Sequence, residues 1–134
     1  MGIRDYDASE PEFATQHPHT TWSIFYDYAM HQALFEGQSW HHITQSIVST
    51  LTDPVVISLD VDGLIPYHCL HTGTPVVGGM TYNQLAYMLD HVHKTRHVIG
   101  AELVEVGAPN GTPYDATVGA RLIQLLAGVV AHPR

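Results

Sequence analysis

One short apolar run constrains the fold more than any other feature: Val55-Val56-Ile57-Ser58-Leu59. Its valines and isoleucine are β-branched, which favours a strand over a helix. A strand with one solvated face alternates polar and apolar residues, whereas a nearly continuous apolar run is typical of a strand covered on both faces, as in parallel sheets. The sequence therefore predicts a parallel sheet with a layer on each side.

Helical patterns alternate with strand patterns along the chain. The predicted helices begin at Ser39, Thr81 and Asp115, and the predicted strands cover residues 55–59 and roughly 98–106. The helical segments carry apolar residues three or four positions apart, which predicts one buried face on each. This order is typical of an α/β fold, and we expect a three-layer αβα arrangement around a mainly parallel sheet. The length of 134 residues corresponds to a single domain.

The charge balance and the cysteine content exclude several classes of protein. A net charge of −8 argues against a nucleic-acid binder and against a basic helix on a membrane surface. The most apolar stretch, residues 122–131, is too short to span a bilayer, and the N-terminus lacks the pattern of a secretory signal. Cys69 is the only cysteine, which excludes an internal disulfide. We expect a soluble, cytoplasmic protein.

Acidic residues follow both predicted strands. Asp60 and Asp62 end the first strand, and Glu105 lies near the end of the second. Because ligands of parallel sheets bind beyond the carboxyl ends of the strands, we expect these three acids at one rim. In extended backbone Asp60 and Asp62 point to the same side, and a hard cation such as Mn²⁺ or Mg²⁺ would compensate their repulsion. The alternative is a solvated strand end.

Histidine is unusually frequent, with 11 residues of this type. Several come in close pairs: His17 and His19, His41 and His42, His68 and His71, His91 and His93. Metal binding by any of them requires a cluster in space that spacing alone cannot establish. The favoured interpretation is that most are surface residues.

Three stretches, in chain order, carry a recognisable set of motifs. They are Gly2-Ile3-Arg4-Asp5-Tyr6-Asp7 with Glu10, then Ser58-Leu59-Asp60-Val61-Asp62-Gly63-Leu64 with Pro66 and Thr72-Gly73-Thr74-Pro75-Val76-Val77-Gly78-Gly79-Met80-Thr81, then Glu102-Leu103-Val104-Glu105-Val106. Together they resemble the ureohydrolases, the family of arginase, agmatinase and formimidoylglutamase. The resemblance covers nearly the whole chain and implies the C-terminal half of the arginase-like fold.

The resemblance also implies a chemistry. Ureohydrolases use a two-manganese centre whose bridging hydroxide attacks a guanidino or formimino carbon and releases urea or formamide. Asp60 and Asp62 match the family's metal-ligand aspartates, and Glu105 matches the catalytic glutamate that grips the substrate's guanidinium. Thr74 matches a substrate neighbour, and Asp7 matches an acid that in arginases helps to hold the amino-acid end of the substrate.

The rest of the family's metal centre has no match in this sequence. In the family a histidine and a cluster of Asp-x-His-x-Asp type come from the first half of a longer chain. We therefore expect one chain of a split enzyme, with a protein partner that carries the N-terminal half. The alternatives are a non-catalytic module that associates with itself, and a gene fragment. The substrate stays open among arginine, agmatine, formimidoylglutamate and related compounds, and the family's trimers and hexamers imply an oligomer.

The sequence departs from the family pattern at Ile65, Leu70 and Glu102. The same loop carries His68, Cys69 and His71, which are side chains of metal-binding type close to Asp60 and Asp62. They could replace missing ligands, or they could be ordinary loop residues. The second interpretation is favoured, because the family does not use this loop segment for metal.

Overall fold

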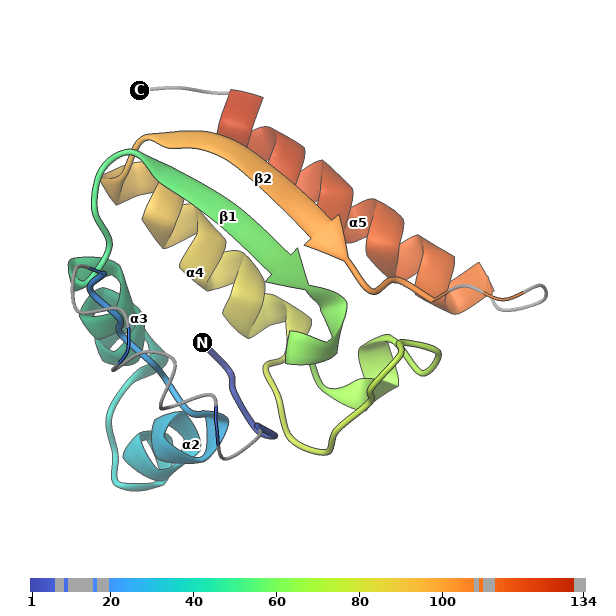
Figure 1. Cartoon of the computed structure of the whole chain (residues 1–134), viewed down its shortest axis with the longest axis horizontal. Coiled ribbons are helices and arrows are strands. Elements are labelled where there is room, and N and C mark those ends of the chain that lie inside the picture. The colour runs from blue at the N-terminus through green and yellow to red at the C-terminus, as the bar shows by residue number, and fades with distance from the viewer. Residues whose placement is uncertain (7–8, 10–15, 17–19, 108, 110–112, 132–134) are drawn as a thin grey trace.

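The structure is a computed structural model of the chain (Figure 1). It describes residues 1–134 except 7–8, 10–15, 17–19, 108, 110–112 and 132–134. The strands are β1 (Val55–Asp60) and β2 (Val98–Val104). The α-helices are α2 (Asp27–Phe35), α3 (Trp40–Ser49), α4 (Tyr82–Thr95) and α5 (Pro113–Ala131). Two short 3-10 helices, η1 (Val61–Gly63) and η2 (Pro66–His68), follow β1.

The two strands pair in parallel, as predicted. Their register places Leu59 beside Leu103, and both pack into the hydrophobic core. The neighbouring pair, Ser58 and Glu102, is joined by a hydrogen bond of 2.8 Å from the serine hydroxyl to the carboxylate. Glu102, one of the departures from the family pattern, therefore has a cross-strand partner on the sheet.

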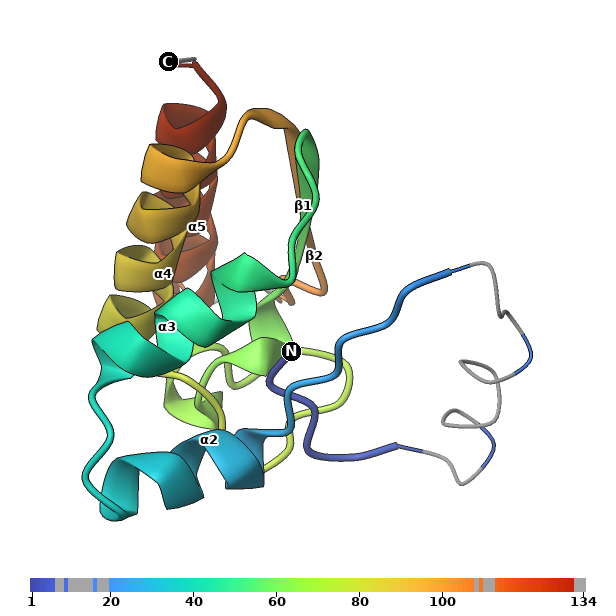
Figure 2. The same ribbon diagram turned by 90° about the vertical axis from the view of Figure 1, so that its left-hand side faces the viewer.

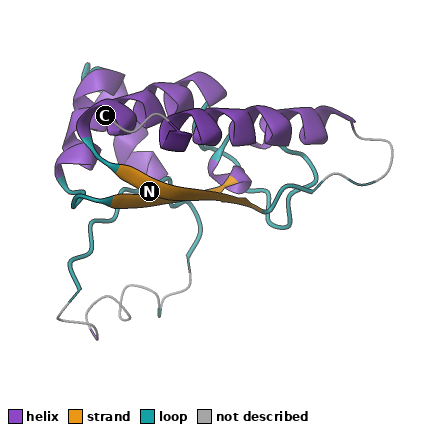
Figure 3. Ribbon diagram, turned by 90° about the horizontal axis from the view of Figure 1, so that it is seen from above, coloured by secondary structure: helices purple, strands orange, loops and turns teal. Residues whose placement is uncertain are grey.

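The described helices supply a layer on one face of the sheet. Figures 2 and 3 show α4 and α5 on the same side of the two strands, and α5 packs against both β2 and α4. The opposite face is open in the described part of the chain, since Val56 keeps 65% of its surface exposed. The α/β class and the parallel sheet are confirmed. Of the three expected layers, the described residues form the sheet and one helical layer.

Local capping explains where two of the helices begin. The Ser39 hydroxyl accepts a hydrogen bond of 3.1 Å from the His42 N–H at the start of α3. Thr81 and Gln84 form the predicted capping box at the start of α4. Helix α5 begins slightly earlier than expected, so that Asp115 lies buried in its first turn. None of the described helices has the length and apolar character needed to cross a membrane.

Helix α2 is an element that the sequence analysis did not assign. Its apolar residues do not form a single stripe: Met30 is buried, whereas Tyr28 is 78% exposed and Phe35 is 85% exposed. A helix without one apolar face has no periodic signal in its sequence. Its packing against α3 comes from the tertiary structure.

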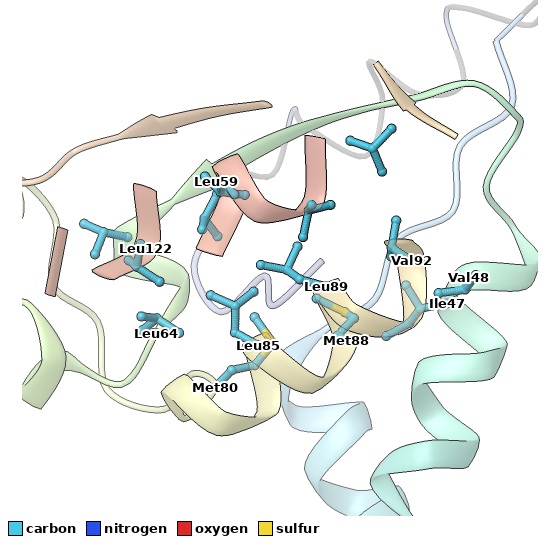
Figure 4. Close-up of a cluster of buried hydrophobic side chains, with 14 of the residues drawn as sticks. Ile47, Val48, Leu59, Leu64, Met80, Leu85, Met88, Leu89, Val92 and Leu122 are labelled. Atoms are coloured by element: carbon cyan, nitrogen blue, oxygen red, sulfur yellow. The ribbon is translucent and has the colours of Figure 1, made fainter. Parts of the chain in front are cut away.

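The core lies between the sheet and the helices (Figure 4). Leu122 of α5 is completely buried, and Leu85 of α4 is 1% exposed. Leu59 of β1 contributes from the strand side, with 8% of its surface exposed. The predicted inward faces of α4 and α5 are confirmed, and they anchor β1 and the loop that follows it.

Candidate metal and substrate site

A tight turn sets the relation between the two aspartates. Asp60 is the last residue of β1, and Asp62 lies in η1, directly after it. The Asp60 carboxylate caps this turn by accepting a hydrogen bond of 3.1 Å from the Asp62 N–H. The sequence pattern predicted extended backbone through both residues. The structure instead places Asp62 in a 3-10 helix, because the Asp60 side chain captures the N–H two residues later.

Glu105 and Thr74 approach these aspartates from two other segments. Glu105 follows β2 and has a positive φ of 63°, which ends the strand before the predicted limit. Its carboxylate lies against Gly73, where an added Cβ would come within 2.9 Å of Oε2. The Thr74 hydroxyl donates a hydrogen bond of 2.9 Å to Asp62 Oδ2. The loop after β1 therefore brings Thr74 to the aspartate pair, and the end of β2 brings Glu105.

The charges of Asp62 and Glu105 act on Asp60. Burial raises the pKa of Asp60; the hydrogen bond from the Asp62 N–H opposes this, and the negative charges of Asp62 and Glu105 raise the pKa further. Within the described residues, no three His, Cys, Asp or Glu side chains are arranged so that they could hold a metal ion. The described part of the chain thus presents a pair of carboxylates next to a third acid, which is less than a complete metal-binding set.

Arg4 supports the turn beneath the acids, a role that the sequence analysis missed. Its Nη2 donates to the backbone carbonyl of Asp62, and its Nη1 lies 3.4 Å from the Gly63 carbonyl oxygen. Gly79 allows this approach, since a Cβ there would come within 3.0 Å of Arg4 Nη1 and 2.7 Å of the Leu64 carbonyl. Arg4 belongs to the family-like N-terminal motif, but its contact spans 58 positions and no local signal predicts it.

A groove of about 850 Å³ runs along β1 and reaches the aspartates. All six residues of β1 line it, and so do residues of α3, α4 and the N-terminal segment. Asp60, Asp62 and Thr74 lie among its lining residues. Asp7, expected near the far end of the substrate, lies outside the described residues.

His68, Cys69 and His71, the loop side chains of metal-binding type, contact other parts of the chain. His68 Nε2 accepts a hydrogen bond of 3.3 Å from the Tyr82 N–H, and burial lowers the pKa of His68. Cys69 is 2% exposed, and burial followed by the charge of Asp115 raises the pKa of its thiol. His71 Nδ1 lies 2.6 Å from Asp115 Oδ2. These contacts join the loop to α4 and α5, which supports the interpretation of ordinary loop residues.

Comparison with known proteins places this chain in a family. Residues 1–128 match the Arginase family model. The chain is 43% identical to human arginase-1 over 65 residues, which is 48% of this chain and 20% of the human protein. It is 35% identical over 83 residues to the N(1)-aminopropylagmatine ureohydrolase of Thermus thermophilus, which is 62% of this chain and 28% of that protein.

The fold agrees with this match. The crystal structure of arginase from Bacillus subtilis aligns with 98% of this chain and 44% of its own length, with a TM-score of 0.73 and 23% identity. The chain therefore spans less than half the length of these relatives. With a family match over almost its whole length and the same fold, the chain belongs to the arginase family.

Proposed function

We propose that this chain supplies the C-terminal part of a ureohydrolase active site, with Asp60 and Asp62 as manganese ligands and Glu105 as the group that holds a guanidino or formimino substrate. The observation that carries the proposal is that Asp60, Asp62 and Thr74 line the groove together, and that Glu105 lies close enough to Asp60 for its charge to raise the pKa of Asp60. These residues come from β1, the loop after it and the end of β2. Family membership supports the same assignment.

The donor chemistry fits a hard divalent cation. Asp60 and Asp62 offer carboxylate oxygens, which are the ligands that Mn²⁺ and Mg²⁺ prefer. A positive ion would offset the repulsion between the two carboxylates. It would also offset the cost of burying the Asp60 charge, which raises the pKa of Asp60. When bound, a pair of such ions lowers the pKa of water and supplies a nucleophile near neutral pH.

The remaining residues of the site bind and orient. Glu105 has a positive φ, and its carboxylate lies against Gly73. This carboxylate would pair with the planar cationic end of a guanidino compound. Thr74 donates to Asp62 Oδ2, which orients that carboxylate and leaves its other oxygen for an ion. The substrate class is a small guanidino or formimino compound.

The proposal includes a protein partner. Two aspartates fill only part of the coordination of two divalent ions, and the relatives contain more than half a chain beyond the matched part. The partner is a polypeptide that carries the N-terminal half of an arginase-family fold. It would cover the groove beside β1, where the whole strand lines the open space, and would bring the missing ligands to Asp60 and Asp62.

Manganese titration tests the metal part of the proposal. We expect the wild-type chain to bind Mn²⁺ weakly, and we expect Asp60→Asn to lower the affinity by about tenfold or more. Asp90→Asn is the matched control, because Asp90 is a half-exposed aspartate of α4 paired with Lys94. Equal Mn²⁺ binding by the wild type and by Asp60→Asn would contradict the assignment.

Activity tests the partner part. The chain mixed with the N-terminal half of an arginase-family protein and Mn²⁺ should release urea or formamide from a panel of guanidino and formimino compounds. Glu105→Gln should retain Mn²⁺ binding and lose turnover. A mixture that forms a complex but shows no turnover on the whole panel would favour the alternative, a non-catalytic module.

A further inference from the structure

Two histidines from different helices meet on the surface formed by α3 and α4. The rings of His41 and His91 have centroids 5.6 Å apart and are nearly perpendicular, at 88°. Helix α3 packs against α4 (Figure 2), and a hydrogen bond of 3.0 Å from Trp40 Nε1 to the Gln84 carbonyl holds the two helices together beside this pair. The pair is therefore fixed by tertiary structure, since the residues lie far apart in the sequence.

Tyr87 orients one of the two rings. Its hydroxyl lies 2.6 Å from His41 Nδ1, and Tyr87 precedes His91 by one turn of α4. In the tautomer in which His41 Nδ1–H donates to this hydroxyl, Nε2 keeps a free lone pair. Histidines that bind metal ions use the same arrangement, in which one ring nitrogen binds and the other donates to a neighbouring oxygen.

We propose that His41 and His91 form a binding site for a borderline divalent transition-metal ion such as Zn²⁺, with Tyr87 as a positioning residue. Two imidazoles that share one tetrahedral zinc ion at about 2.0–2.1 Å hold their ring centres roughly 5–6 Å apart. The observed separation of 5.6 Å falls within this range. Water completes the coordination, since the described residues contain no third His, Cys, Asp or Glu grouped with this pair.

The chemistry of this site differs from that of the carboxylate rim. Imidazole nitrogens favour Zn²⁺, Ni²⁺ and Cu²⁺, whereas the oxygens of Asp60 and Asp62 favour Mn²⁺ and Mg²⁺. An ion held by His41 and His91 would join α3 to α4 and stabilise the folded chain by mass action. The proposed site is thus a structural metal site that cross-links two helices, and it does not depend on the proposed catalytic function.

Zinc titration of the untagged, chelator-treated chain tests the proposal. We expect wild-type protein to bind one Zn²⁺ that is lost, or weakened by about tenfold or more, in His41→Ala and in His91→Ala. Tyr87→Phe should weaken the same site by about tenfold, because it removes only the orienting hydroxyl. The matched control is His42→Ala, which deletes a neighbouring exposed histidine of α3 and should bind like the wild type.

Spectroscopy identifies the ligands directly. With Cu²⁺ in place of Zn²⁺, electron paramagnetic resonance should report two imidazole nitrogens in the wild type and one in each single-histidine variant. The double variant Asp60→Asn/Asp62→Asn should leave these signals unchanged, which separates this site from the carboxylate rim. Wild-type Zn²⁺ affinity in both His41→Ala and His91→Ala, with circular dichroism showing intact folding, would overturn the proposal.

Discussion

The charge of Asp60 lowers the stability of the folded chain, whereas the same charge would favour the proposed metal binding. Burial and the charges of Asp62 and Glu105 raise the pKa of Asp60, so its ionised form is disfavoured in the folded chain without metal. When folding raises the pKa of an acid, its ionised form lowers the stability of the folded chain. This loss of stability is complete above the folded-state pKa and disappears as the pH falls through that pKa. In the proposed metal site, a bound cation would offset this loss of stability.

Asp60→Asn should therefore raise the free energy of unfolding in EDTA at neutral pH while it lowers Mn²⁺ affinity. The gain should stay below about 1 kcal/mol, because the carboxyl is partly exposed and solvent screens its interactions. The asparagine amide oxygen can still accept from the Asp62 N–H, so the turn is preserved. The difference from the wild type should shrink as the pH is lowered. Marked destabilisation of the variant in EDTA would show that Asp60 is a structural residue.

At the scale of the element, α5 contributes to the hydrophobic core mainly through one face. Leu122 is completely buried between α5 and the sheet, whereas the next residue, Ile123, is 59% exposed. Both are large apolar residues of the same helix. Comparing their substitutions therefore separates the effect of burial on stability from the effect of helix propensity.

Leu122→Ala should lower the free energy of unfolding by about 2–5 kcal/mol, because it removes buried methyl groups and leaves a cavity. Ile123→Ala should change it by no more than about 0.5 kcal/mol. Chemical denaturation followed by circular dichroism measures both values. Similar losses in the two variants would mean that Ile123 is covered in solution by a contact that the single chain does not contain.

At the scale of the whole molecule, the described residues cover the sheet on one side only. An apolar sheet face and an open strand edge are rarely left exposed to water. Val56 on β1 and Ile99 on β2 are 65% and 55% exposed. Under the proposed partner arrangement, the contact with a partner or a second copy of the chain would form on this surface.

Val56→Lys should therefore increase the monomer fraction of the isolated chain in sedimentation experiments and weaken its complex with an N-terminal-half partner. A charge placed on this face would have to be buried in the contact. Val77→Lys is the matched control, because Val77 is an equally apolar residue of the loop after β1 and is 86% exposed. Equal association of the two variants would place the contact elsewhere on the molecule.

The sequence alone determined the features that depend on neighbours within a few positions. The apolar run at residues 55–59 predicted β1, and the capping box at Thr81 predicted the start of α4. The placement of Asp60, Asp62 and Glu105 at the ends of the two strands followed from the same local pattern. Family resemblance added Thr74, whose hydroxyl the structure brings to Asp62.

Contacts between distant segments were decided only by the tertiary structure. The support that Arg4 gives to the Asp62 turn spans 58 positions, and the meeting of His41 with His91 depends on how α3 packs against α4. The apolar run predicted coverage of β1 on both faces, yet the described chain covers one. Local patterns record which side chains prefer burial, because that preference belongs to each residue, whereas the surface that buries them is a property of the assembled molecule.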